Sequence, residues 1–316
     1  MIDPAAVRSR KPRTKANWLK LRRRVVTSTE LGALFAVSPW KTPFALWAEK
    51  AGRVELEVRN NDAMALGQEL EDAARRLWER ETGGRAEPAG LTFKWIDDPG
   101  LGSSFDGFAT MTDPATGVES AGLVECKVVG WRQWQDQWRL ADGSIEPPAH
   151  YRLQAECELM LSGRTWLDFA VIVLSEEGRT FERVRVEPHD PLRTAIVQKV
   201  REFWRSVRND DAPPPDFRKD LPTLRELFPS RDTPWEPVDD DELARVDDAA
   251  RRAVEASARE KAAKADADAA RAEMLHALRG CDVAQLPSAR VSHRPDKRGR
   301  RTLRITAVEN NIQQES

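Results

Sequence analysis

The sequence predicts an α+β protein, built in α/β/α-like layers around a central mixed sheet. Helical patterns come first, then a cluster of strand patterns, one inserted helix, and more strands. Hydrophobic residues make up 40% of the 316 residues and charged residues 32%, enough for a real core under a solvated surface. Every aromatic residue lies between residues 18 and 235, so we expect the packed core to end near residue 235.

Capping residues and hydrophobic spacing predict the helices. The residues 27–30, Thr-Ser-Thr-Glu, offer N-cap oxygens to a short helix that ends near Phe35. Pro43 suits the first turn of a second helix, which stops at Gly52. Longer helices are expected at 62–82, 148–162 and 190–207.

Strand patterns occur between these helices, at 91–96, 105–111, 120–129, 166–174 and 179–187. The fullest of them reads Leu-Val-Glu-Cys-Lys-Val-Val over residues 123–129. Its period of two places Val124, Cys126 and Val128 on one face, and Leu123, Glu125, Lys127 and Val129 on the other.

Composition divides the chain into four parts: a basic arm at 1–24, a core at 25–210, a Pro-rich strap at 211–238 and a tail at 239–316. Seven prolines between 213 and 237 oppose a long helix there and favour an extended strap. The tail begins with a polar, alanine-rich helix at 241–280 that ends at Gly280. A short hairpin with strands near 289–293 and 301–307 follows, with a basic tip.

Charge is distributed unevenly along the chain. Residues 1–24 contain nine Lys or Arg and one acid, a net charge of +8, whereas the whole chain has −2. Such an arm can bind phosphate, and a solvated flexible terminus remains an equal alternative. No apolar run approaches the ~20 residues that span a membrane. The three cysteines are far apart and no leader pattern is visible, so we expect a reduced, cytoplasmic protein.

Glu125 and Lys127 are charged residues in an otherwise apolar strand. Desolvating them costs several kcal/mol unless they are paired or bind something charged. An ion pair between the two is one explanation. The other is a catalytic site.

Asp106 lies nineteen positions before Glu125, at the start of the preceding strand pattern, and is followed by Gly107. Carboxylates from two neighbouring strands can hold a hard divalent cation. The Lys127 ammonium could then orient or deprotonate a metal-bound water, or stabilise charge on a phosphate. A simple Asp-Gly hairpin turn is the alternative for this pair.

Two helices supply further candidates. On helix 62–82, Glu71 lies at the flank of the expected buried stripe of Leu66, Leu70, Ala73, Leu77 and Trp78. Glu71 can therefore face the core, although a surface pair with Arg75 is also open. On helix 148–162, Tyr151 and Gln154 share a face, and Gln154 could position a water or a phosphate oxygen.

These motifs, in this order and spacing, resemble the PD-(D/E)XK nuclease superfamily. They are Gly67…Glu71, Ser104-x-Asp106-Gly107, Glu125-Cys126-Lys127 and Tyr151-x-x-Gln154. More narrowly, they are similar to the YqaJ-like viral recombinase and lambda exonuclease family, whose opening motif resembles the stretch from Trp18 to Glu30. The resemblance covers roughly residues 18–208.

The resemblance implies a Mg²⁺-dependent enzyme, with Mn²⁺ able to substitute, that degrades the 5′ strand of linear duplex DNA and leaves a 3′ overhang. Asp106, Glu125 and the backbone carbonyl of Cys126 would bind the metal, with Glu71 acting directly or through water. Lys127 would activate water or stabilise the transition state. Gln154 would orient the nucleophile.

The resemblance also implies a site for the terminal 5′-phosphate at Arg22 and Thr29, with Ser28, Ser104 and Tyr151 contributing to DNA binding. Free amides at a helix N-terminus beside Thr29 would assist. Two positions depart from the family pattern: Asp72 replaces a proline, and Thr29 replaces a serine. The implied partners are duplex DNA ends, further copies of the chain in a trimer and a single-strand annealing protein, in a bacterial cytoplasm with a phage or prophage origin.

Two other functions stay open. One is an endonuclease of the same superfamily, of restriction or junction-resolving type. The other is a non-catalytic DNA-binding scaffold in which Glu125 and Lys127 form only a salt bridge. For residues 239–316 we expect oligomerisation, contact with a partner protein, or DNA contact through Arg298, Arg300 and Arg301.

Overall fold

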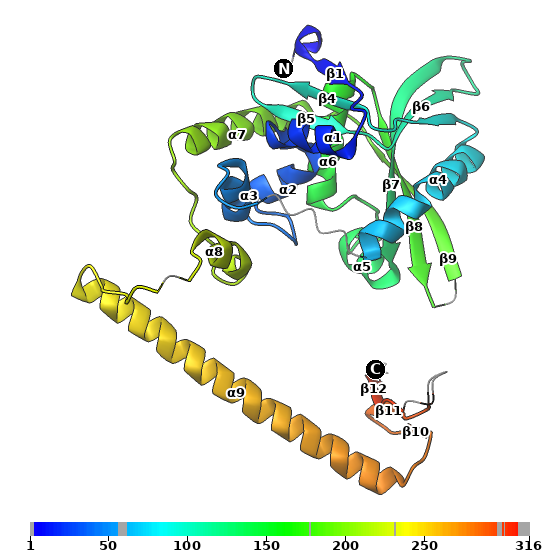
Figure 1. Cartoon of the computed structure of the whole chain (residues 1–316). Helices are drawn as coiled ribbons and strands as arrows, with labels where there is room; N and C mark the ends of the chain where they lie inside the picture. The colour runs from blue at the N-terminus through cyan, green and yellow to red at the C-terminus, as the bar shows by residue number, and fades with distance from the viewer. Residues whose placement is uncertain are drawn as a thin grey trace. The chain divides into compact units, whose positions relative to one another are not determined.

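The computed structural model describes residues 3–55, 62–176, 178–230, 232–295, 299 and 301–308. It forms two compact units, Met1–Ser230 and Arg231–Ser316, which are described separately (Figure 1). The first unit is an α+β fold with mixed sheets and flanking helices, which confirms the predicted class.

The central element of the first unit is a five-stranded sheet. Its strands, in spatial order, are β3 (Arg85–Pro88), β6 (Gly107–Thr112), β7 (Glu119–Gly130), β8 (Leu167–Ser175) and β9 (Gly178–Val186). The β7–β8 pair is parallel and the other three pairs are antiparallel. Four of these strands match predicted ones to within a few residues, and β3 was not predicted.

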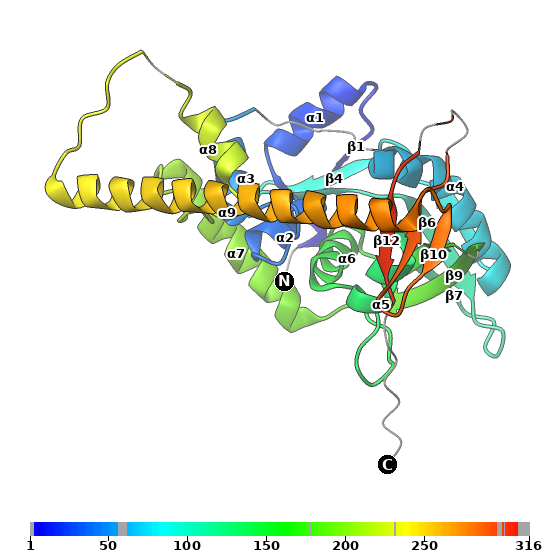
Figure 2. The same cartoon turned by 90° about the horizontal axis from the view of Figure 1, so that it is seen from below.

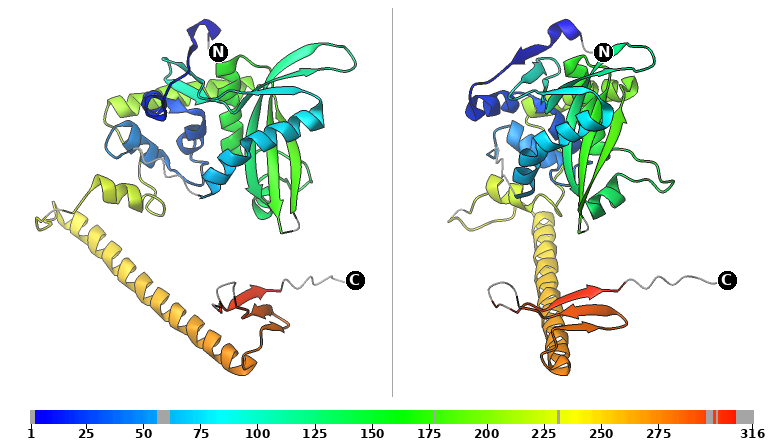
Figure 3. Two further views of the ribbon diagram at one scale, coloured as in Figure 1. Left: turned by 45° about the vertical axis from the view of Figure 1, so that its right-hand side comes forward. Right: turned by 90° about the vertical axis from the view of Figure 1, so that its right-hand side faces the viewer.

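Helices cover both faces of this sheet (Figure 3). Helix α4 (Asp62–Thr82) packs Ala74, Leu77 and Trp78 on the face that contains Val124. The opposite face, with Leu123 and Val129, belongs to the main core together with α6 (Ala149–Ser162). The predicted division of β7 into two faces is therefore confirmed.

A second, four-stranded sheet lies beside the first. Its order is β1 (Arg8–Arg10), β4 (Phe93–Ile96), β5 (Leu101–Ser104) and β2 (Val26–Thr27). The chain leaves β5 in this sheet and enters β6 in the other through Phe105 and Asp106. Asp106-Gly107 is thus a crossing between two sheets, and the hairpin-turn alternative is wrong.

The remaining helices of the first unit are α1 (Lys15–Arg23), the short η1 (Pro4–Ala6), η2 (Ser28–Glu30) and α2 (Leu31–Leu34), α3 (Pro43–Lys50), α5 (Trp131–Gln137), α7 (Asp190–Arg208) and α8 (Leu221–Leu227). The predicted cap at residues 27–30 is present as a capping box between Thr27 and Glu30. Helix α8 lies within the Pro-rich strap, which is therefore not extended throughout.

The buried stripe predicted on α4 is wrong at its first member. Leu66 is 41% exposed, because the first turns of α4 lie outside the hydrophobic cluster that buries Ala74 and Trp78.

The second unit contains α9 (Asp240–Leu278), which buries none of its residues, as its polar composition predicts. Arg279 and Gly280 follow it with positive φ angles, which fits the predicted glycine stop. Strands β10 (Val283–Gln285), β11 (Ala289–Ser292) and β12 (Arg304–Ala307) then form a three-stranded antiparallel sheet (Figure 2). The expected two-stranded hairpin therefore has a third strand.

Of the basic tip, Arg298 and Arg300 lie outside the described residues, and Arg301 pairs with Asp282 at 2.8 Å. No helix in the described ranges is long and apolar enough to cross a membrane.

Candidate active site

Strand pairing brings Asp106 beside the charged residues of β7. Gly107 pairs with Val124 in the antiparallel register, so Asp106 lies next to Glu125 across the two strands. The backbone amide of Cys126 donates a hydrogen bond to Asp106 Oδ2 at 2.9 Å. This bond fixes the Asp106 carboxylate against β7.

Glu125, Lys127 and Gln154 form a closed polar triangle. Lys127 Nζ lies 2.6 Å from Glu125 Oε1 and 3.5 Å from Gln154 Oε1. Gln154 Nε2 donates to the same Glu125 oxygen at 2.5 Å. The predicted partners from β7 and α6 therefore meet, and the Gln154 amide is oriented by one cation and one carboxylate.

Glu158 joins this cluster and was not predicted. It is 1% exposed, and its Oε1 accepts hydrogen bonds from Gln154 Nε2 at 2.9 Å and from Ser28 Oγ at 3.4 Å. The available sequence signal was its position four residues after Gln154, which places both on one helix face.

Glu71 approaches the cluster from the opposite face of the sheet. It is half-buried on α4, and its backbone oxygen accepts a hydrogen bond from Cys126 Sγ at 3.4 Å. Arg75 pairs with Asp72 at 2.6 Å, and among the described residues no ion pair joins it to Glu71, which argues against the alternative of a surface pair. Burial and the Glu125 carboxylate raise the pKa of Glu71.

Carboxylates outnumber cations in this cluster. Burial, and then the Glu125 carboxylate, raise the pKa of Asp106 and the pKa of Glu158 well above their usual ranges. For Lys127, burial lowers the pKa, but the attraction of Glu125 and other neighbours outweighs it and raises the pKa above its ordinary value. Lys127 is therefore an ammonium group at neutral pH.

The donor chemistry of these residues fits a hard divalent cation. Within the described ranges, no three His, Cys, Asp or Glu side chains are gathered closely enough to enclose a metal ion. Asp106 and Glu125 nevertheless present adjacent carboxylates, and burial together with their mutual repulsion raises the pKa of Asp106. A bound cation would relieve this repulsion, since oxygen ligands with negative charge suit Mg²⁺.

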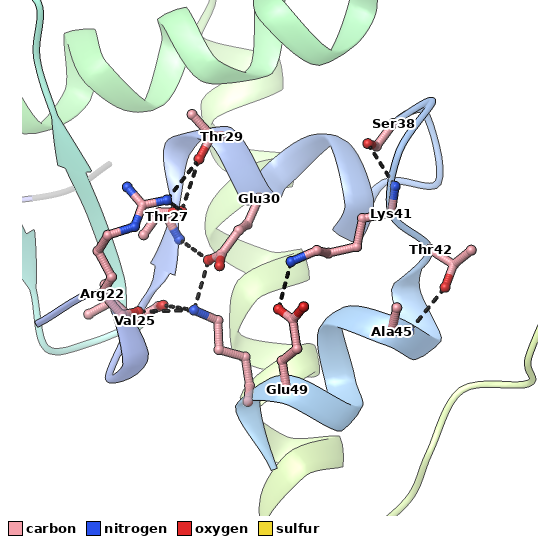
Figure 4. A network of polar contacts seen from close by, with 11 residues as sticks. Arg22, Val25, Thr27, Thr29, Glu30, Ser38, Lys41, Thr42, Ala45 and Glu49 are labelled. Atoms are coloured by element: carbon pink, nitrogen blue, oxygen red, sulfur yellow. Dashed lines mark hydrogen bonds and ion pairs between the residues drawn. The ribbon is translucent and has the colours of Figure 1, made fainter. Parts of the chain in front are cut away.

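A second polar cluster surrounds Arg22 (Figure 4). Arg22 Nη2 donates to Thr27 Oγ1 at 3.3 Å and to Thr29 Oγ1 at 3.2 Å. The guanidinium lies 4.5 Å from the centre of the Trp18 ring, and the Trp18 indole donates to Ser104 Oγ at 2.8 Å. Arg22 and Thr29 are thus in contact, Ser104 joins them through Trp18, and Thr29 is exposed.

A buried ion pair holds the backbone of this second cluster in place. Lys50 Nζ lies 2.8 Å from Glu30 Oε2 and also donates to the backbone oxygens of Arg22 and Val25. Glu30 Oε2 accepts the Thr27 amide at 2.8 Å. That amide is therefore occupied. Helix η2 continues directly into α2, and the two together span only Ser28–Leu34.

Ser28 connects the two clusters. It is 3% exposed, and its hydroxyl faces Ser103 Oγ at 2.7 Å as well as Glu158. One turn of chain thus presents Thr29 to Arg22 on the outside and Ser28 to Glu158 on the inside. Tyr151 borders the first cluster, with its ring 4.8 Å from Lys127 Nζ.

Comparison with known proteins supports the resemblance that the motifs indicate. The model of the YqaJ-like viral recombinase domain matches residues 17–165, a stretch that contains both clusters. The match covers just under half of the 316-residue chain. The family expected from the motifs is confirmed.

Several proteins resemble this chain. The uncharacterized protein YqaJ of Bacillus subtilis (strain 168) is 24% identical over 196 residues, which are 60% of this chain and 56% of that protein. The chain thus spans about half the length of this relative.

Among solved structures, the alkaline exonuclease LHK-Exo of Laribacter hongkongensis is 24% identical, with 62% of this chain and 94% of that one covered and a TM-score of 0.47. A putative exonuclease of Eubacterium rectale is 13% identical, with coverage of 71% and 96% and a TM-score of 0.39.

Proposed function

We propose that this protein is a divalent-metal-dependent exonuclease that degrades the 5′ strand of linear duplex DNA and leaves 3′ single-stranded overhangs. The observation that supports this most is the meeting of Asp106, Glu125, Lys127 and Gln154 within a YqaJ-like domain.

Each residue of the first cluster has its own role in the proposed reaction. Asp106, Glu125 and the Cys126 carbonyl, with Glu71 nearby, would hold Mg²⁺, or Mn²⁺ in its place. The bound metal would supply positive charge that polarises the scissile phosphate. Lys127 acts as a charged stabiliser of the phosphate in the transition state, because Glu125 keeps it protonated. Gln154, held by Glu125 and Glu158, orients the attacking water.

The reaction restores its own substrate end. Water attacks phosphorus, the bond from phosphorus to the 3′ oxygen breaks, and that oxygen takes a proton. The shortened strand then begins with a new 5′-phosphate. Arg22 and the Thr29 hydroxyl bind this terminal phosphate, since a guanidinium beside an exposed hydroxyl matches its charge and oxygens. Ser104 supports this binding through Trp18, which lies against Arg22. Ser28 and Tyr151, which contact Glu158 and Lys127, would contribute to DNA binding beside the first cluster.

We also propose a setting for the enzyme. It acts on DNA ends as a homo-oligomer, a trimer by resemblance, and hands its overhangs to a single-strand annealing protein. We place it in the cytoplasm of a bacterial host, with a phage or prophage origin. Light scattering of the full chain tests the trimer.

The decisive experiment compares linear duplex DNA, with and without a 5′-phosphate, against closed circular DNA, each with Mg²⁺ and with chelator. We expect Mg²⁺-dependent release of nucleotides from phosphorylated linear ends only. Cleavage of the circle would make the protein an endonuclease. No cleavage of either would favour the non-catalytic scaffold, for which the 2.6 Å Glu125–Lys127 ion pair is the supporting observation.

A further inference from the structure

Helix α1 has a second charged face, apart from the one that holds Arg22. Trp18 and Arg22 are four residues apart and face Ser104 and Thr29. Asn17, Lys20, Leu21 and Arg24 follow the i, i+3, i+4, i+7 pattern and form a different face. Two faces of one helix therefore point to two different surroundings.

This second face lines a hollow of about 470 Å³. The other wall is the segment that leads from β1 into α1, and the cations of both walls are Arg10, Lys11, Arg13, Lys20 and Arg24. Among the residues that the structure describes, no acidic one lines the hollow. Within the same part of the chain, none of these five cations takes part in an ion pair, and all five are exposed.

Five unpaired cations around one hollow repel one another, and a polyanion would relieve that repulsion. One phosphate group neutralises at most two of them, whereas a run of phosphodiesters can neutralise all five. The hollow therefore matches a nucleic-acid backbone better than a single small anion.

We propose that the hollow between β1 and α1 binds the phosphodiester backbone of the DNA, away from the terminal nucleotide. This inference rests on the proposed function for the identity of the ligand. Helix α1 separates the two sites, and its diameter with side chains is about 10 Å. At about 3.4 Å of helix axis per phosphate of one strand, the hollow engages phosphates about three positions from the end.

The test measures DNA binding in chelator, where no cleavage occurs. The variant is Lys20→Gln with Arg24→Gln, which removes two charges and keeps good helix-forming residues. The matched control is Lys199→Gln with Arg205→Gln, which removes an exposed Lys and Arg from α7. Fluorescence anisotropy gives the affinity for a 5′-phosphorylated duplex between about 50 and 200 mM salt.

We expect the slope of log affinity against log salt to become shallower by about 1.8 in the variant, because each phosphate that the protein neutralises contributes about 0.9 to that slope. The preference for a 5′-phosphate should stay unchanged, because Arg22 is intact. A second double variant, Arg10→Gln with Lys11→Gln, removes two charges from the other wall and should make the salt slope shallower by a similar amount. This second variant replaces the first one if the first one unfolds.

An unchanged slope in a folded variant, or an equal decrease in the α7 control, would overturn the proposal. A third outcome would also overturn it: wild type and variant bind DNA equally well once inorganic phosphate is added at matched ionic strength. The hollow would then bind single phosphates. Since the readout is binding in chelator, failure of the hollow and failure of the nuclease proposal are distinguishable.

Discussion

At the scale of single residues, Lys127 is held in place by three neighbouring side chains. It contacts Glu125, Gln154 and the face of Tyr151. This arrangement keeps it charged and aimed at the proposed phosphate position. An ion pair alone would need neither Gln154 nor the neighbouring Asp106.

Lys127→Ala should abolish cleavage and spare the fold. We expect kcat to fall at least about 100-fold, the usual scale for losing a group that stabilises transition-state charge. Glu125 keeps its hydrogen bond from Gln154 in this variant, so cooperative unfolding and DNA binding should persist. Glu125→Ala, in contrast, leaves a buried ammonium unpaired and should lower the free energy of unfolding by about 3 kcal/mol. A Lys127→Ala protein that cuts at the native rate would remove Lys127 from catalysis.

Glu158 is a positioning residue, because it touches Gln154 and not the substrate. Glu158→Gln should lower kcat by about tenfold and leave KM unchanged, since it alters only the orientation of Gln154. The folded-state pKa of Glu158 is raised, so the native state favours its protonated form. Its contribution to stability is present below the unfolded pKa and is lost as the pH rises through the folded pKa.

The stability of Glu158→Gln relative to wild type should therefore improve as the pH rises from acidic to alkaline. Denaturant unfolding at several pH values measures this, with kcat recorded in parallel. A pH-independent difference in stability would show that Glu158 is not the buried acid we describe.

Arg22 should determine the preference for phosphorylated ends. Arg22→Gln is expected to bring cleavage of 5′-phosphorylated and 5′-hydroxyl duplexes to similar rates, because the charge that binds the phosphate is gone. Thr29→Ser keeps the hydroxyl and should retain the preference. Competition between the two duplexes in one tube measures it. Full preference in Arg22→Gln would place the phosphate site elsewhere.

At the scale of elements, periodicity predicted α4, α6, α7, β7, β8 and β9 because each is long enough to repeat its pattern. It missed β1, β2 and β5, which are two to four residues long and depend on partners far along the chain. The same limit applies to the site. The motif spacing located Glu125 and Lys127, whereas the contact of Trp18 with Ser104 joins positions 86 residues apart and leaves no local signal.

The packing of α2 on α6 can be tested with glycine. A Cβ on Gly32 would lie 2.7 Å from the Cβ of His150, too close for either backbone to accept without moving. Gly32→Ala should lower the free energy of unfolding by about 1–3 kcal/mol. A Cβ on Gly67, in α4, would meet no neighbouring atom of the described residues within 4 Å, so Gly67→Ala should raise stability by about 0.5–1 kcal/mol. Thermal unfolding of both variants measures the contrast, and an equal effect would contradict the packing.

At the scale of the whole molecule, both polar clusters lie in the first compact unit, Met1–Ser230. Helix α9 of the second unit buries none of its residues. Composition had already indicated such a tail, because it holds no aromatic residue after Trp235. An exposed, polar helix of this kind suits contact with other chains, so we propose that the tail serves in assembly or in binding a partner protein.

A chain that ends at Ser230 should keep both folding and cleavage. We expect its thermal midpoint to stay within a few degrees of the full chain, because no residue of α9 is buried. Any change should appear in oligomeric state or in processivity. Light scattering and a cleavage time course check this, and absence of all cleavage by the folded shorter chain would place part of the site in the second unit.

Above all, we propose that the Asp106–Glu125–Lys127 cluster cuts DNA from 5′ ends with a divalent metal. The most direct measurement follows a phosphorylated linear duplex with one strand labelled at either its 5′ or its 3′ end. We predict that, with Mg²⁺, the 5′ label is released first as a mononucleotide and the 3′ label stays on long DNA, with no release in chelator. Early release of the 3′ label, or no release with any divalent metal, would contradict this mechanism.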